Sequence, residues 1–156
     1  MDQTLTKKQF IDATRVERAR WEMLLLRVGP GRMCVPVGVA GQSVAEVVGA
    51  LYERERWLVE RLASMQGTQA TVEDVPKPEA GTHSVAGTLG ASRDAFNEIL
   101  RLLVPVSEAD LFGQGRFDWA YGRTLAEVVA DCTSKYYLEH DGPIRSWLSQ
   151  PVVQAV

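Results

Sequence analysis

Several residue types that mark common protein classes are scarce in this 156-residue chain. Its two cysteines, Cys34 and Cys132, lie far apart and in no Cys-x-x-Cys or zinc-ligand spacing, which argues against a disulfide framework, a zinc site and a redox motif. Only two histidines are present, His83 and His140. We therefore expect no metal and no cofactor, and we interpret Cys132 as a core residue.

The chain also lacks long apolar runs and an excess of basic residues. No apolar run reaches the roughly 18 residues typical of a membrane span, and the polar first ten residues are unlike a signal peptide. The 17 basic residues are scattered among 20 acidic ones, which favours neither nucleic acid nor a membrane surface as a partner. We expect a cytoplasmic protein with a single domain over residues 1–156.

The periodicity that remains is helical, and no alternating strand pattern of useful length is present. Capping boxes at Thr6, Ser43 and Thr124 predict helices that begin just after these residues. We predict four helices, over about residues 7–28, 44–65, 85–104 and 124–148. Long connections follow the second and third helices, and Gly142 with Pro143 is expected to bend the last one. Each helix has one apolar stripe, which indicates an all-α four-helix bundle.

Three of these stripes carry ionisable residues near their centres. Glu17 lies mid-stripe in the first helix, Glu55 in the second, and Glu139 with His140 in the last. Residues in the middle of bundle helices meet at about the same level, so we expect these side chains and Tyr136 around one cavity. These five residues are the candidate catalytic groups.

Clustered carboxylates in a low dielectric suit general acid–base chemistry, because some of their pKa values rise. One of Glu17 or Glu55 would activate a water molecule, and His140 or Tyr136 would protonate the leaving atom.

Aromatic residues supply candidate walls for such a cavity. Trp21, Tyr52 and Trp119 are the candidate substrate-binding residues, because each offers apolar surface with a polar tip.

The alternative interpretation of the buried glutamates is a hydrogen-bonded polar layer. In that case an arginine turns inward to pair the buried carboxylate. The arginines placed to do so are Arg18, Arg20, Arg54 and Arg56.

Three runs of sequence resemble one protein family. They are SVAEVVGALYERERWLVERL in the second helix, FDWAYGRTL before the last helix, and YYLEHDGPIRSWL within it. Together with the EADLF turn and ERARW of the first helix, they resemble the DinB/YfiT-like four-helix bundles, with the ClbS/DfsB proteins as the closest branch. The resemblance covers nearly the whole chain. It implies an up-down-down-up bundle with two long crossover connections, and pairing of related bundles implies a homodimer.

Many DinB-like relatives bind a divalent metal through three histidines, one on the second helix and a pair on the fourth. Carried onto this chain, these positions fall on Ala50, Tyr136 and His140, so one ligand is kept. Tight metal binding requires several ligands in the correct positions, so the resemblance does not imply a metal site in this chain. The alternative is a metal site formed by His140 and carboxylates, in which case the chain would be a metal- and thiol-dependent transferase.

The ClbS/DfsB resemblance implies a metal-independent protective protein that acts on a small molecule. One member opens the cyclopropane of a genotoxin by hydrolysis, so a hydrolase for electrophilic or strained-ring metabolites is one hypothesis. The alternative is a non-catalytic bundle that binds a small amphipathic ligand. The residues alone leave open whether the chain is an enzyme. A third hypothesis is that the chain is a structural relative of these proteins whose core is filled and which has no ligand cavity.

Overall fold

The computed structural model describes residues 5–37, 41–67 and 85–150, and these residues are mostly helical. Helix α1 spans Lys7–Val28 and begins with the predicted capping box. The Thr6 side chain accepts a hydrogen bond from the Gln9 backbone N–H, and the Gln9 side chain accepts one from that of Thr6. The helix ends at Gly29, whose φ of 73° suits a residue without a Cβ atom.

Helix α2 also has the predicted bounds, Val44–Met65, and the Ser43 side chain caps it by accepting from the Glu46 N–H. Helix α3 spans Val85–Leu103. The crossover predicted between these two helices falls almost wholly outside the described residues, as does His83.

No regular element was predicted between α1 and α2, but part of this segment is regular. It contains a short 3-10 helix, η1 (Pro30–Arg32), and two antiparallel strands, β1 (Pro36–Val37) and β2 (Gln42–Ser43). In the register, Pro36 faces Ser43 and Val37 faces Gln42. Strands of two residues are too short to show an alternating pattern, so periodicity does not reveal them.

The last predicted helix is in fact two helices, α5 (Leu125–Asp131) and α6 (Ser134–Ser149). The Thr133 hydroxyl donates to the Val129 carbonyl at 2.7 Å, and the Thr133 N–H turns to the Ala130 carbonyl instead. This competition by a side chain ends the regular helical hydrogen bonding.

The sequence analysis did not predict this interruption. Gly142 and Pro143, where a bend is expected, both lie within α6. Ahead of α5, the connection from α3 contains α4 (Glu108–Phe112) and a second 3-10 helix, η3 (Asp118–Ala120).

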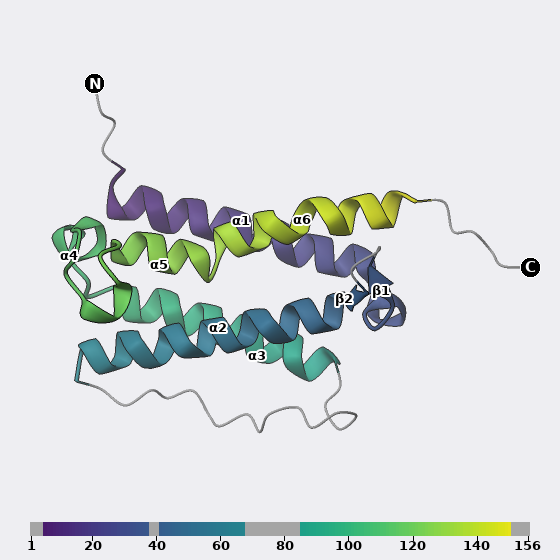
Figure 1. Cartoon of the computed structure of the whole chain (residues 1–156), viewed down its shortest axis with the longest axis horizontal. Coiled ribbons are helices and arrows are strands. Elements are labelled where there is room, and N and C mark those ends of the chain that lie inside the picture. Colours follow the sequence, from purple (N-terminus) through teal and green to yellow (C-terminus); the bar gives the residue numbers. More distant parts are fainter. Residues whose placement is uncertain (1–4, 38–40, 68–84, 151–156) are drawn as a thin grey trace, which may run out of the picture.

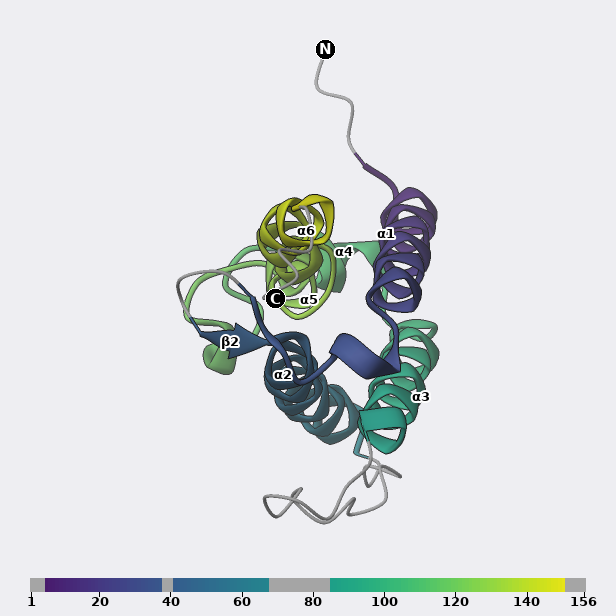
Figure 2. The ribbon, with the colours of Figure 1, turned by 90° about the vertical axis from the view of Figure 1, so that its right-hand side faces the viewer.

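The long helices lie along a common axis (Figure 1). Helices α1, α5 and α6 run from left to right in that view, whereas α2 and α3 run from right to left. Viewed along the axis, α6 lies beside α1 and α2 lies beside α3 (Figure 2). These two pairs also have the most extensive backbone packing, and the seam between α1 and α3 is looser.

The buried apolar residues form two clusters, one toward each end of the helices. The cluster near α4 and α5 includes Leu58, Ile99 and Leu125, and the cluster near the strands includes Trp21 and Leu51. Between them lies a set of buried polar side chains from four helices, which we call the polar layer. Its members are Arg18 of α1, Glu55 of α2, Ser92 of α3 and Tyr137 of α6.

None of the helices in the described ranges combines the length and the apolarity that crossing a membrane requires.

The capping box of α1 makes a testable contribution to stability. Thr6→Ala removes the acceptor for the Gln9 N–H, so we expect the free energy of unfolding in urea to fall by about 1 kcal/mol. Thr6→Ser keeps a hydroxyl at the same position and should retain the stability of the parent. Equal losses in the two variants would show that the cap does not act through this hydrogen bond.

Candidate functional site

The polar layer is a closed hydrogen-bond network built around the buried carboxylate of Glu55. Arg18 Nη1 donates to Glu55 Oε2 at 2.9 Å and lies 3.0 Å from the Tyr137 hydroxyl. Arg18 Nη2 donates to Ser92 Oγ at 3.2 Å, and Ser92 Oγ in turn donates to Glu55 Oε1 at 2.6 Å. Both carboxylate oxygens therefore have a partner, and each partner comes from a different helix.

Burial dominates the electrostatics of this network. The side chain of Glu55 is 0% exposed, and desolvation raises its pKa to about 7 although Arg18 and the Ser92 hydrogen bond oppose the shift. The Arg18 guanidinium also lies over the Phe96 ring, 4.9 Å from its centroid. Glu55 is thus a buried acid that changes its protonation state near neutral pH.

The polar layer corrects the prediction for Glu17. The buried position in the middle of α1 belongs to Arg18, whereas Glu17 is half-buried and lies 3.8 Å from Arg20. Both residues fit the spacing between Thr14 and Trp21, so the helical period alone does not choose between them. The signal that separates them is charge, because a carboxylate facing Glu55 would be repelled whereas an arginine is attracted.

The residues of α6 also differ from the prediction. Glu139 is exposed and His140 is half-buried, so neither joins Glu55 in the core. The interruption at Thr133 changes which face of α6 is buried, and the residues that face inward are Tyr136, Tyr137 and Ile144. The expected convergence of three glutamates on one cavity is therefore wrong, and Glu55 alone occupies a buried position.

Tyr136 and His140 are in contact with each other, but the tyrosine hydroxyl is already engaged. Their ring centroids lie 4.5 Å apart, and the Tyr136 hydroxyl donates to the Val47 carbonyl at 2.6 Å. Burial raises the pKa of Tyr136 to about 12 and lowers the pKa of His140. Tyr136 thus ties α6 to α2 in a structural role.

The three candidate substrate-binding aromatics do not share one wall. Trp21 is buried and stacks on Tyr137 with a centroid distance of 5.4 Å, and Tyr52 is also buried. Trp119 is half-buried and packs against Phe117 and Trp57.

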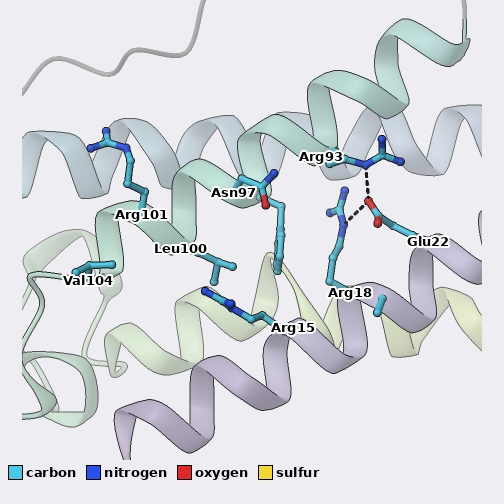
Figure 3. Close-up of a pocket in the computed structure, with 10 residues that line it drawn as sticks. Arg15, Arg18, Glu22, Arg93, Asn97, Leu100, Arg101 and Val104 are labelled. Atoms are coloured by element: carbon cyan, nitrogen blue, oxygen red, sulfur yellow. Dashed lines mark hydrogen bonds and ion pairs between the residues drawn. The ribbon is translucent and has the colours of Figure 1, made fainter.

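Two grooves run along the seam between α1 and α3, and sequence reasoning missed both. The first, with a volume of about 490 Å³, is the polar groove. Its polar lining consists of Arg15, Arg18, Glu22, Arg93, Asn97 and Arg101. Figure 3 shows Glu22 of α1 joined to Arg93 of α3 across this groove, whereas the Arg101 side chain points away from α1. The three predicted aromatics do not line it.

The second groove, with a volume of about 410 Å³, is the apolar groove. Its apolar lining includes Met23, Leu25, Leu26, Met33, Val85 and Leu89. It also shares Arg18, Ala19, Glu22 and Arg93 with the polar groove, so the two meet end to end. Trp21, Tyr52 and Trp119 are absent from its lining as well.

The carboxylate of Glu22 marks the junction of the two grooves. Its Oε1 atom accepts from Arg18 Nε at 3.4 Å and from Arg93 Nε at 3.0 Å (Figure 3). Arg18 therefore connects the buried Glu55 to the groove surface.

A metal site rebuilt from carboxylates is not assembled in the described part of the chain. Within residues 5–37, 41–67 and 85–150, no three His, Cys, Asp or Glu side chains gather closely enough to hold a metal ion. His140 packs on Tyr136, whereas Glu55 is bound to Arg18 and Ser92. His140 and Glu55 therefore have other contacts and do not meet.

Comparisons with known proteins give a similarity of fold. No family model and no curated protein matches the chain. A solved structure of an uncharacterised protein from Escherichia coli UTI89 is similar, with a TM-score of 0.70 and 19% sequence identity. The match covers 92% of this chain and 93% of that one, so the whole fold is shared.

The raised pKa of Glu55 predicts a pH dependence of stability. Between its ordinary value of 4.5 and about 7, the folded protein binds more protons than the unfolded chain. The stabilisation of the folded state that comes from protonated Glu55 is thus fully present below about pH 4.5 and is lost as the pH rises through about 7. Across that interval, we expect the stability of the parent to fall relative to Glu55→Gln by on the order of 3 kcal/mol.

Urea unfolding of the two proteins at a series of pH values measures this difference. A difference that stays constant from about pH 4.5 to about pH 8 would contradict a raised pKa at Glu55.

Proposed function

We propose that this chain is a DinB/YfiT-like four-helix bundle of the ClbS/DfsB type, which protects the cell by binding a small molecule. The resemblance of the helical segments and the up-down-down-up directions of α1, α2, α3 and α5–α6 support the family (Figure 1). The proposal includes independence from metals and other cofactors. The cytoplasmic location and the homodimer expected from the sequence are also parts of it.

The apolar groove is the observation that carries the binding function. It is a concave site between two helices, and large apolar side chains on its rim face solvent. Met23 is 62% exposed and Leu26 is 75% exposed, so an apolar ligand that covers them gains the free energy of their removal from water. Glu55, by contrast, lies beneath Arg18 and Ser92 and is 0% exposed. The arrangement favours retention of a ligand over direct chemistry on it.

Filling the groove tests this function. Ala19 is exposed on α1 and lines both grooves, so a Trp side chain at this position occupies the space of a ligand. Isothermal titration with decanol should give binding to the parent and a loss of about tenfold or more in Ala19→Trp. Ala13→Trp is the matched control, because Ala13 is exposed on α1 and lines neither groove. Absence of binding to the parent would overturn the proposal.

Hydrolysis of an electrophilic or strained-ring metabolite is the second candidate function. The pKa of about 7 at Glu55 favours it, since such a group exchanges a proton readily at neutral pH. Arg18 and Ser92 both contact Glu55 and both line the apolar groove.

Glu55→Gln separates the two functions, because it keeps the shape of the side chain and removes its ionisable group. If the protein is a binder, decanol affinity should change less than about tenfold, and activated cyclopropanes should not be turned over by either protein. Turnover by the parent that falls by orders of magnitude in Glu55→Gln would establish the hydrolase instead.

A further inference from the structure

Arg15 of α1 is a cation that lines the polar groove. Within the described residues its side chain makes no hydrogen bond or ion pair. Its side chain extends along the groove toward Leu100 of α3 (Figure 3). Asn97 of α3 lines the same groove, and its amide supplies hydrogen-bond donors there.

The other arginines of the groove are already paired. Arg18 contacts Glu55 and Glu22, Arg93 contacts Glu22, and Arg101 contacts Glu98. The four arginines of the groove are thus accompanied by three carboxylates, those of Glu22, Glu55 and Glu98. The positive charge that has no carboxylate partner among the described residues is that of Arg15. The polar groove therefore has an excess of positive charge and complements an anion.

The two grooves form one continuous path along α1. From Arg15 to Leu26 the helix rises about 16 Å, so a charged end and an apolar end of one ligand fit the seam together. At the junction, Arg18 and Arg93 already hold the carboxylate of Glu22. These guanidinium groups thus show the geometry that accepts a carboxylate in this seam.

We propose that the seam between α1 and α3 binds an amphipathic anion, with its carboxylate or phosphate at Arg15 and Asn97 and its chain in the apolar groove. This inference rests on the proposed binding function and adds the chemical class of the ligand. Arg15 selects for the negative end, and the rim of Met23 and Leu26 selects for the chain.

Titration with three ligands of equal chain length tests the inference. We expect decanoate and decyl phosphate, each below its micelle concentration, to bind the full chain more tightly than decanol. In Arg15→Gln the affinity for the two anions should fall about tenfold, whereas that for decanol stays unchanged. The anion affinities should also fall as salt concentration rises. The relative affinities of decanoate and decyl phosphate identify which head group the site prefers.

Arg20→Gln is the control for loss of charge. Arg20 also lies on α1, pairs with Glu17 and lines neither groove, so this variant should bind all three ligands as the parent does. Equal binding of decanol and decanoate, with no effect of Arg15→Gln, would overturn the anion site and leave the proposed binding function intact. Failure of all three ligands to bind would overturn both.

Discussion

The ion pair between Arg18 and Glu55 is the constraint on which the rest of the structure depends. A carboxylate that is 0% exposed is costly without a partner, and removal of one member of such a pair leaves an uncompensated buried charge. Ser92 and Tyr137 complete the hydrogen bonding, so α1, α2, α3 and α6 are all tied at one level. The polar layer fixes the register of the helices, while the apolar clusters on either side supply most of the burial.

Local signals predicted the helices, but not the partners within the core. The caps at Thr6 and Ser43 placed the starts of α1 and α2 correctly, because a cap is decided by residues within one turn. Glu55 was also found, since its neighbours on the stripe are all apolar. Arg18 was one of four arginines that could have paired with Glu55. Which arginine does so depends on how α1 packs against α2, and a single sequence does not show that packing. Periodicity locates a face to within about one residue, which is too coarse to separate Glu17 from Arg18.

The helix interruption shows a different limit of sequence reasoning. Pro143 was the conspicuous helix breaker, yet the regular hydrogen bonding stops at Cys132 and Thr133. A buried Thr hydroxyl bonding to the Val129 carbonyl is a weak local signal that depends on tertiary burial. With this unpredicted interruption, Glu139 is exposed and His140 is half-buried, so the predicted catalytic cluster is not assembled. The grooves were missed for a related reason, because they arise from the spacing of α1 and α3 and not from a motif.

The polar layer and the grooves are physically coupled through Arg18. Its Nη atoms hold Glu55, Ser92 and Tyr137 in the core, and its Nε faces Glu22 at the junction of the grooves. The charge of Glu22 already acts to raise the pKa of Glu55, although burial is the larger cause. A negative group placed in the polar groove would act in the same direction, because a nearby negative charge disfavours the ionised form of a carboxyl group. If the proposed anion binds there, thermodynamic linkage requires that protonation of Glu55 favour its binding by the same factor.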